Sequence, residues 1–300
     1  MKYFIRYLLF KLLTFSTCVL PLRFGYWIAL RVADLGYFIG DRRGRKAVIR
    51  NLHTVLPDAG EQRIIHEARW VFRNWGKYLC EFFRFREFDE QYFIKHCSST
   101  HLEHVTDALK RGKGVIILSA HFGNWEMGAA YYSVHCGFPV NSLVVRQVSP
   151  LLENLFLKER SANHTKLIYI DDDPRKMMRA LRNNEMVCIL GDRDPTGGGI
   201  EVDFFGRKCR FPQGPARLAV STGCAIVPGV VLRRSNDSFV MSTHPMLEVP
   251  EIDDPAITDK KGEQVRRLTQ AFAHYLENEI REHPEQWPAF YDVWGEEWKQ

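Results

Sequence analysis

The stretch that decides the fold is Gly-Val-Ile-Ile-Leu-Ser-Ala-His-Phe-Gly-Asn-Trp-Glu-Met-Gly, residues 114–128. It opens with a short apolar run rich in β-branched residues, which is typical of a buried strand. A turn containing Gly123 follows, and residues 124–134 have a helical pattern. We therefore expect a strand, a turn and a helix, with His121 at the end of the strand and Glu126 at the start of the helix. In α/β sheets, ligands bind at this carboxyl end of the strands.

From residue 114 onward the chain repeats this alternation. Further short apolar runs occupy residues 140–145, 166–170, 186–190 and 225–232. Further helical patterns lie near residues 150–163, 174–184 and 213–222, and a last amphipathic helix ends near residue 283. Buried strands that alternate with helices predict an α/β fold with a mostly parallel central sheet flanked by helices. A hairpin is expected at residues 200–205.

The N-terminal region differs from the rest in charge and hydropathy, and its pattern is mainly helical. Residues 1–56 carry ten Lys and Arg against two Asp, a net charge of +8, whereas the rest of the chain sums to −3. Residues 3–22 are strongly apolar apart from Arg6 and Lys11, and Pro21 ends the run. Basic, aromatic and aliphatic residues mixed in this way favour a helix that lies on, or inserts shallowly into, an anionic cytoplasmic leaflet.

Two other interpretations of residues 3–22 remain open. The run is near the lower length limit of a transmembrane helix, and a core helix of a soluble domain is also apolar all round. A secretory signal peptide is not expected, because no small-residue cleavage site follows Leu20. We therefore predict a membrane-associating segment at residues 1–40 and a single α/β domain at residues 41–300.

The composition excludes several classes of protein. With 45% hydrophobic and 26% charged residues, the chain is globular and neither disordered nor polytopic. Its seven cysteines contain no CxxC pair, so we expect neither a disulfide framework nor a thiolate zinc site. No other metal and no cofactor is predicted. A nucleic-acid partner is not expected, because the basic residues near the N-terminus are interleaved with apolar side chains. Neither a GxSxG nucleophile elbow nor a Walker lysine occurs.

His121 and Glu126 are the first candidates for catalysis. A carboxylate beside an imidazole fixes its tautomer and stabilises the imidazolium, so the two together make a competent general base. Within one helix, residues five positions apart would diverge by about 140°. The pair can meet only if His121 precedes the helix, as the Gly123 turn indicates. The structural alternative is an ordinary histidine that is hydrogen-bonded at a helix start.

Two further positions are candidates for binding the substrate. Arg146 ends an apolar run, and a guanidinium there suits a phosphate or an oxyanion; a surface ion pair is the alternative. Gly214 precedes Pro215 at an expected helix start, whose N–H groups can hold an anion; an ordinary helix cap is the alternative.

Three charged residues, Asp192, Arg193 and Asp194, follow the apolar run at 186–190. Burial of an unpaired charge is costly, so these residues must be paired or solvated. We expect Arg193 to contact the substrate, with the two carboxylates orienting it; a purely structural network of the three is the alternative.

The segment HFGNWE, residues 121–126, resembles the HxxxxD/E signature of glycerolipid-type acyltransferases. Its HxGNWE form is similar to that of the bacterial lipid A biosynthesis acyltransferases and the related phosphatidylinositol mannoside acyltransferases. The other blocks that resemble this family, in its order and spacing, are residues 50–52, 56–57, 190–195, 200–206, 214–219, 226–229 and 283–287. The resemblance therefore covers nearly the whole chain.

The resemblance implies an acyltransferase on the cytoplasmic face of the inner membrane. It would move a fatty acyl chain from a thioester of acyl carrier protein or coenzyme A to a hydroxyl of a glycolipid. We expect a lipid A precursor as the acceptor, and a phosphatidylinositol mannoside or another phospholipid-type acceptor is the alternative. A non-catalytic lipid-binding protein on the same fold is the alternative from a different class.

In such a reaction, His121 would accept the proton of the acceptor hydroxyl, with Glu126 as its partner and no covalent enzyme intermediate. The negative charge that forms on the thioester oxygen requires fixed hydrogen-bond donors. The backbone N–H groups at Gly123 and Asn124, or an arginine, are donors of the right kind, and the sequence does not select between them.

Overall fold

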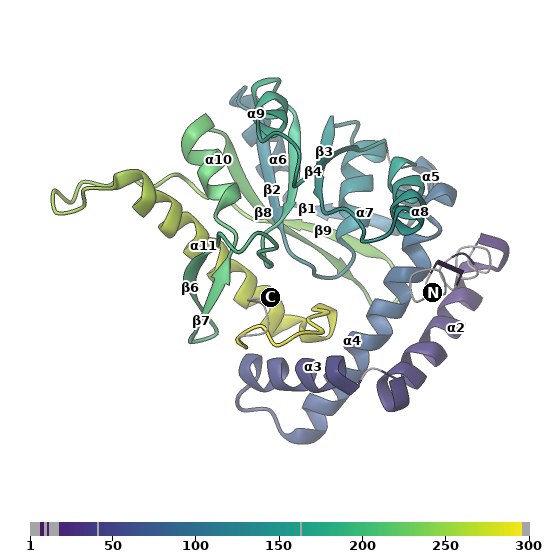
Figure 1. The fold of residues 1–300 in the computed structure, drawn as a ribbon. Coiled ribbons are helices and arrows are strands. Elements are labelled where there is room, and N and C mark those ends of the chain that lie inside the picture. The colour runs from purple at the N-terminus through teal and green to yellow at the C-terminus, as the bar shows by residue number, and fades with distance from the viewer. Residues whose placement is uncertain (1–6, 9–10, 12–17, 41, 163, 296–300) are drawn as a thin grey trace.

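The computed structural model of the protein describes residues 7–8, 11, 18–40, 42–162 and 164–295. Its centre is a seven-stranded sheet with the order β1-β9-β8-β2-β5-β3-β4 (Figure 1). The strands are β1 (Cys97–Thr100), β2 (Val115–Ser119), β3 (Val140–Val144), β4 (Lys166–Tyr169), β5 (Met186–Leu190), β8 (Ala225–Arg233) and β9 (Phe239–Thr243). All neighbours pair in parallel except β8 and β9, which confirms the predicted mostly parallel sheet.

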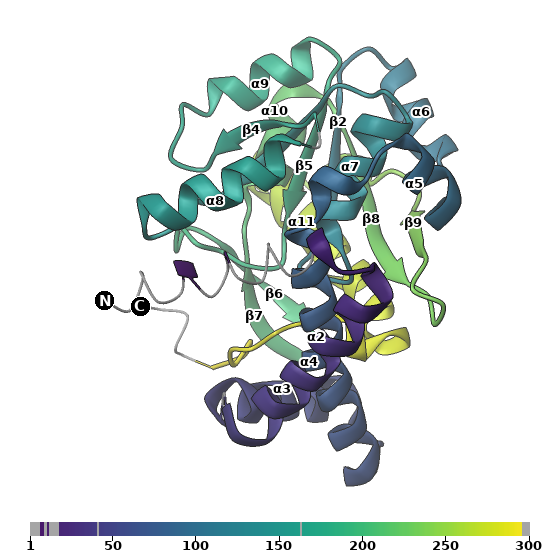
Figure 2. The same ribbon diagram turned by 90° about the vertical axis from the view of Figure 1, so that its right-hand side faces the viewer.

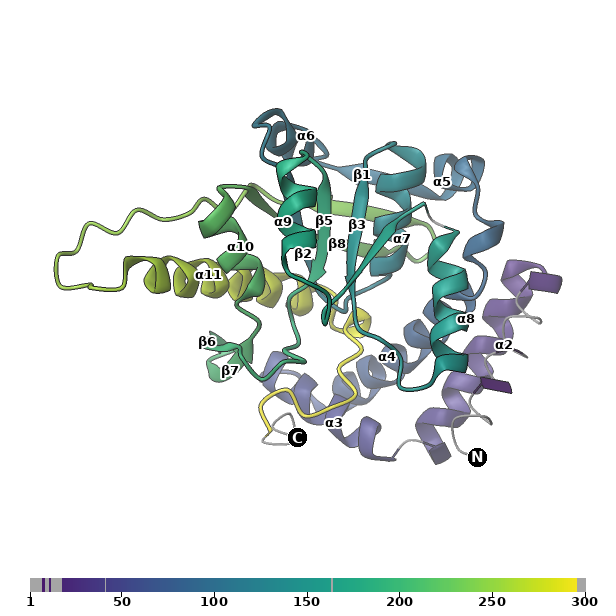
Figure 3. The same cartoon turned by 45° about the horizontal axis from the view of Figure 1, so that its top comes forward.

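Helices cover both faces of the sheet, because alternate residues of a strand point to opposite sides. Ile116 and Leu118 of β2 belong to a core on one face, and Val115 and Ile117 belong to a second core on the other. The first face is covered by α9 (Arg175–Arg182), α10 (Gly214–Thr222) and α11 (Lys260–Glu282). The second is covered by α5 (Glu90–His96), α6 (Glu103–Lys110), α7 (Trp125–Ala130) and α8 (Pro150–Ser161). Figure 3 shows α7 and α8 on the side of the sheet away from α10 and α11.

A separate two-stranded hairpin follows β5 and consists of β6 (Ile200–Phe204) and β7 (Arg207–Phe211), as predicted for this region. It packs against α11, where Gln270 donates a hydrogen bond of 2.8 Å to the backbone oxygen of Asp203. Phe204 is buried in the first core, and its ring stacks on Trp294 with 5.8 Å between centroids. The hairpin is therefore fixed to the C-terminal part of the domain.

The N-terminal helices pack beside the sheet. They are α2 (Leu22–Leu35), the π-helical turn η1 (Gly36–Gly40), α3 (Arg42–Val55) and α4 (Glu61–Phe82). Figure 2 shows α2 alongside α4, and Asp34 of α2 accepts two hydrogen bonds each from Arg69 and Arg73 of α4, at 2.8–2.9 Å. These two arginines hold the pKa of the Asp34 carboxyl well below its usual range. The ion pairs fix α2 on α4.

The predicted membrane-associating segment, residues 1–40, is described only in part. Most of its apolar run at residues 3–22 lies outside the described residues. Among the residues that are described, no helix combines the length and the apolar character that crossing a membrane requires. The α2 helix and η1 turn belong to this segment, and the boundary at residue 40 stays a prediction.

Asp34→Asn tests the attachment of α2 to α4. The substitution removes hydrogen bonds from two cations to a carboxylate, so we expect a loss of about 2 kcal/mol in the free energy of unfolding at pH 7. Because the folded-state pKa of Asp34 is lowered, its contribution is present above the unfolded pKa of about 4 and is lost as pH falls below it. Urea unfolding of both proteins at several pH values should show the difference shrinking towards acid pH. A difference independent of pH would contradict this account.

Candidate active site

The His121 imidazole and the Asp192 carboxylate meet at the carboxyl edge of the sheet. His121 lies two residues beyond β2 and Asp192 two residues beyond β5, and Ser119 and Leu190 at the ends of these strands are register partners. Asp192 Oδ1 accepts hydrogen bonds from His121 Nδ1 at 2.9 Å and from the His121 backbone N at 3.0 Å. With the proton on Nδ1, the Nε2 atom of His121 is left with a free lone pair.

Asp192 is buried, which alone would raise its pKa, but the adjacent His121 and Arg193 hold the pKa below its ordinary value. The residue is therefore a carboxylate that can stabilise a positive charge on the imidazole. The ring of Trp125 meets the His121 ring edge to face, with 5.0 Å between centroids, and so helps to fix the ring plane.

The carboxylate of Glu126 has a different partner from the one predicted. Its Oε1 accepts hydrogen bonds from Arg160 of α8, at 3.0 Å from Nε and 2.8 Å from Nη2. The carboxylate that bonds to His121 is Asp192, because β2 and β5 are neighbours and their ends bring the two side chains together. Glu126 and Arg160 both line the same cavity as His121, so the two residues of the sequence motif share a site without being hydrogen-bonded partners.

The turn between His121 and Trp125 is clamped against β8. Gly123 has a φ of +58°, and a Cβ at this position would lie 1.7 Å from the Val231 backbone oxygen. The Gly123 N–H donates to the Gln286 backbone oxygen at 2.8 Å, and the Asn124 N–H donates to the Val231 backbone oxygen at 3.2 Å. The structure thus gives these two backbone donors, expected to bind the substrate, partners within the protein.

The Asn124 side chain is also engaged within the fold. It is fully buried, and its Oδ1 accepts the N–H of Met127 at 3.1 Å, which makes Asn124 the N-cap of α7. Its Nδ2 donates to Glu81. The Asn124 side chain is therefore part of the scaffold that carries His121 and Glu126.

Arg193 points into the site, whereas Asp194 supports a loop. Arg193 lines the cavity, donates to the Pro288 oxygen at 3.1 Å and lies over the Tyr291 ring at 4.7 Å. Asp194 accepts hydrogen bonds from the backbone and hydroxyl of Thr196 at 3.0 and 2.7 Å, and from the Gly199 N–H. The glycine-rich loop after β5 is thus held by Asp194.

Of the other two predicted positions, Gly214 lies in the cavity wall and Arg146 does not. Gly214 is the first residue of α10 and lines the cavity together with Pro215. The Arg146 side chain is half exposed, pairs with Asp171 at 3.0 Å and stacks on the Tyr169 ring at 3.7 Å. The surface ion pair, given as the alternative for Arg146, is the arrangement found.

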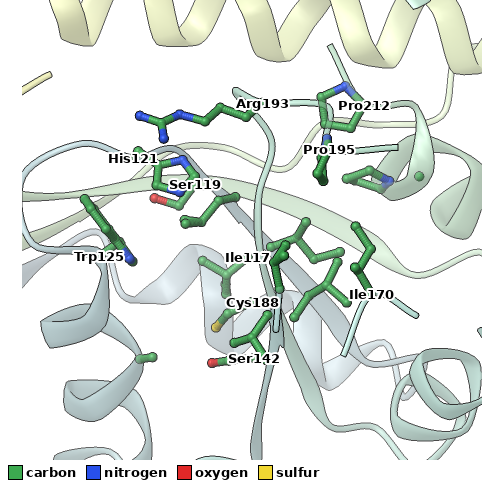
Figure 4. A pocket seen from close by; sticks show the side chains of 18 of the residues that line it. Ile117, Ser119, His121, Trp125, Ser142, Ile170, Cys188, Arg193, Pro195 and Pro212 are labelled. Atoms are coloured by element: carbon green, nitrogen blue, oxygen red, sulfur yellow. The ribbon is translucent and has the colours of Figure 1, made fainter. Parts of the chain in front are cut away.

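A cavity of about 670 Å³ extends from His121 along the carboxyl edge of the sheet. Its ionisable residues, which are His121, Glu126, Arg160, Arg193 and Asp194, contrast with a lining that is otherwise largely apolar. Figure 4 shows the Arg193 side chain above His121, with Ser119 and Trp125 beside His121. Further from His121, Ile117, Cys188 and Ser142 stand in one row across β2, β5 and β3 and line the cavity. A cavity of this polarity suits a largely apolar ligand whose polar group lies near His121.

Three buried polar atoms near His121, namely Ser119 Oγ, Asp192 Oδ2 and Arg193 Nε, have no hydrogen-bond partner among the described residues. Buried polar atoms normally have one. All three are enclosed by protein atoms, so they add to the polarity of the region around His121.

The sequence does not mark Arg160, Ser119 or Glu81 as residues of the functional site. Arg160 is one of several charged residues of α8, and nothing in its spacing connects it to Glu126. Ser119 directly precedes the Ala-His pair at the strand end, and its position alone was a usable signal. Glu81 lies in an amphipathic helix that carries charged residues along its whole length, so no pattern marks this one as buried.

Comparison with known proteins identifies the family. Residues 1–295 match the bacterial lipid A biosynthesis acyltransferase family, and the chain belongs to it. The chain is 27% identical over 225 residues to the phosphatidylinositol mannoside acyltransferase of Mycolicibacterium smegmatis, which covers 74% of the chain and 70% of that protein. It is 28% identical over 228 residues to the Mycobacterium tuberculosis (strain H37Rv) protein of the same name, covering 74% and 68%. It is 22% identical over 257 residues to the lipid A biosynthesis lauroyltransferase of Escherichia coli K12, covering 83% of both. The protein is therefore an acyltransferase.

Gly123→Ala tests the close contact between β8 and the turn at residues 121–125, which is called the motif turn below. Gly137 has a similar φ of +69° but nothing within 4 Å of an added Cβ, so Gly137→Ala is a matched control for backbone strain alone. We expect Gly137→Ala to cost about 1 kcal/mol in the free energy of unfolding. Gly123→Ala should cost at least about 3 kcal/mol, because the backbone of β8 must also move. Equal unfolding midpoints in urea for the two variants would show that Gly123 does not lie against Val231 as described.

Proposed function

We propose that the protein moves a fatty acyl chain from a thioester of acyl carrier protein or coenzyme A to a hydroxyl of a membrane glycolipid. The observation that carries this proposal is the His121–Asp192 pair at the polar end of a largely apolar cavity. The base and the space for the acyl chain are contiguous. No cofactor is required, since the thioester supplies the activated acyl group.

In the proposed mechanism, the acceptor hydroxyl donates its proton to His121 Nε2 while its oxygen attacks the thioester carbonyl carbon. Asp192 stabilises the imidazolium that forms, because its Oδ1 accepts from Nδ1. The tetrahedral intermediate then collapses, the carbon–sulfur bond breaks, and the imidazolium returns its proton to the departing thiolate. The ester is formed without a covalent bond to the enzyme.

The negative charge of the tetrahedral intermediate needs a donor that is not already used. The Gly123 and Asn124 N–H groups are engaged with Gln286 and Val231, which leaves the arginine alternative. Arg193 lines the cavity, and its guanidinium carries further N–H donors besides the one that Pro288 accepts. We assign the oxyanion or a substrate phosphate to Arg193. Glu126 takes part by holding the Arg160 guanidinium at the cavity wall.

The membrane attachment that we propose uses the outer face of α2 and η1. Phe24 and Trp27 stack on each other and are 47% and 53% exposed, and Phe38 and Ile39 are 56% and 68% exposed. Arg31 lies over the Trp27 ring. Exposed aromatic residues mixed with arginine suit the headgroup region of an anionic leaflet. This supports a location on the cytoplasmic face of the inner membrane.

The acceptor is to be decided by experiment between two glycolipid classes. Two of the relatives are named as phosphatidylinositol mannoside acyltransferases and one as a lauroyltransferase of lipid A biosynthesis, and the chain's identity to the first two is higher, at 27–28% against 22%. Purified full-length protein should be incubated with labelled acyl-coenzyme A or acyl carrier protein and with vesicles that contain either acceptor. Transfer to one acceptor identifies it. No transfer from either donor to any glycolipid would refute the proposed substrate class.

His121→Ala and Asp192→Asn test the proposed base. Each should lower kcat by at least about a hundredfold, because the first removes the proton acceptor and the second removes the group that fixes its tautomer. The KM for the acyl donor should change little. Steady-state kinetics with the acyl donor and acceptor pair that is active in the wild-type protein measure both constants. Near-normal kcat in either variant would remove that residue from the mechanism.

Trp27→Glu and Phe38→Glu test the membrane surface. Each places a carboxylate where an apolar ring would meet an anionic leaflet, so flotation with anionic vesicles should fall at least about tenfold. Ile94→Glu on α5 is the control, since Ile94 is similarly exposed at 54% but lies outside the proposed surface. Equal flotation of all three variants would show that α2 and η1 do not contact the bilayer.

A further inference from the structure

A buried carboxylate, Glu81, lies behind the motif turn. It is in the last turn of α4 and is fully buried. Its two oxygens accept hydrogen bonds from three separate segments. The donors are Tyr26 Oη of α2, Asn124 Nδ2 at 2.5 Å, and Arg233 Nη1 and Nη2 at 2.5 and 2.7 Å.

Stability alone is a weak explanation of this arrangement. A buried ion pair such as Glu81–Arg233 loses much of its attraction to desolvation, and apolar residues of similar volume are often as stable. What apolar residues cannot do is orient a buried amide. The Glu81 carboxylate is the acceptor for the Asn124 side-chain amide, so it fixes which way that amide faces.

The orientation of Asn124 matters because this residue is held at three points. Its Nδ2 is bound by Glu81, its Oδ1 caps α7 through the Met127 N–H, and its own N–H is bound by Val231. Asn124 stands three residues after His121 and two before Glu126. A change in its orientation therefore moves the strand end that carries one functional residue and the helix start that carries the other.

Arg233, on the far side of the network, is itself held by hydrogen bonds. Arg233 is 7% exposed at its side chain, and its backbone exchanges two hydrogen bonds with the Gln286 side chain, at 2.8 and 3.0 Å. The Gln286 backbone oxygen in turn accepts the Gly123 N–H. Glu81 is thus joined to the motif turn directly through Asn124 and indirectly through Arg233 and Gln286.

We propose that Glu81 is a positioning residue of the acyl-transfer reaction, which acts through Asn124 to hold the turn between His121 and Glu126. The proposal rests on the proposed function insofar as that function makes His121 the base. Glu81 itself touches neither substrate nor reacting atoms. Its effect should appear in kcat, since misplacement of a general base by a fraction of an ångström slows the chemical step without removing substrate contacts.

Glu81→Gln and Asn124→Ser test the proposal from the two ends of the hydrogen bond. In Glu81→Gln, the glutamine NH₂ group faces side chains that are themselves donors. In Asn124→Ser, the serine hydroxyl can still cap α7, and only the hydrogen bond to Glu81 is lost. Each variant should lower kcat by about tenfold or more with the donor KM within about twofold. The double variant should be no slower than the slower single variant, because both substitutions break the Glu81–Asn124 hydrogen bond through which Glu81 is proposed to act. If the kcat losses of the two single variants multiply in the double variant, the proposal is overturned.

Asp34→Asn is the control for loss of a buried carboxylate. It also destabilises the packing of α4 but has no bond to the motif turn, so it should keep wild-type kcat.

If Glu81→Gln does not fold, Asn124→Asp takes its place as the second test of the proposal. Aspartate keeps the cap and sets a second carboxylate against Glu81, so it should be slower than Asn124→Ser; wild-type kcat in both Asn124 variants would overturn the proposal. Absence of transfer by the wild-type protein would instead refute the proposed function.

Discussion

The contact between the Gly123 backbone and the Val231 carbonyl of β8 is the constraint on which the site depends. Only a residue without a side chain can approach the strand so closely with a positive φ. The approach turns the chain sharply out of β2 and starts α7 within a few residues. His121 is thereby left at the sheet edge and Glu126 in the first turn of the helix, both facing one cavity.

The parallel sheet supplies the second half of the site. Since β2 and β5 are neighbours with aligned ends, the residues two positions beyond each end are brought together, and His121 meets Asp192. The same geometry puts Arg193 beside them. Charges that are far apart in the sequence thus converge at one edge of a largely apolar cavity, where fixed dipoles and charges act more strongly than in water.

The strands that the sequence predicts well are those whose burial decides their composition. Apolar runs such as 115–119 and 186–190 become β2 and β5, because central parallel strands are covered on both faces. β1, with Cys-Ser-Ser-Thr, and β9 were not predicted. β1 is a short edge strand of polar residues whose conformation is set by pairing with β9 and not by its own pattern. Tertiary pairing of this kind has no local signal.

The candidate site likewise has features that the local sequence predicts and features that depend on tertiary contacts. The motif predicts that His121 and Glu126 lie near one another, but it does not give their hydrogen-bond partners, which follow from the order of strands in the sheet and from the position of α8. Asp192 is 71 residues away from His121 along the chain, and Arg160 is 34 residues away from Glu126. Similarly, the expectation that the Gly123 and Asn124 N–H groups bind the substrate overlooked the backbone oxygens of Gln286 and Val231, which become neighbours only in the folded protein.

In the proposed mechanism, His121 presents Nε2 to an acyl group whose chain lies in the cavity. A crystal structure with an oxoalkyl thioether analogue of the active donor, which keeps the carbonyl but cannot be cleaved, tests it most directly. The carbonyl carbon should lie beside His121 Nε2, the carbonyl oxygen should face Arg193, and the chain should lie against Ile117 and Cys188. An acyl chain bound outside this cavity, or an Nε2 atom bonded to another protein group, would contradict it.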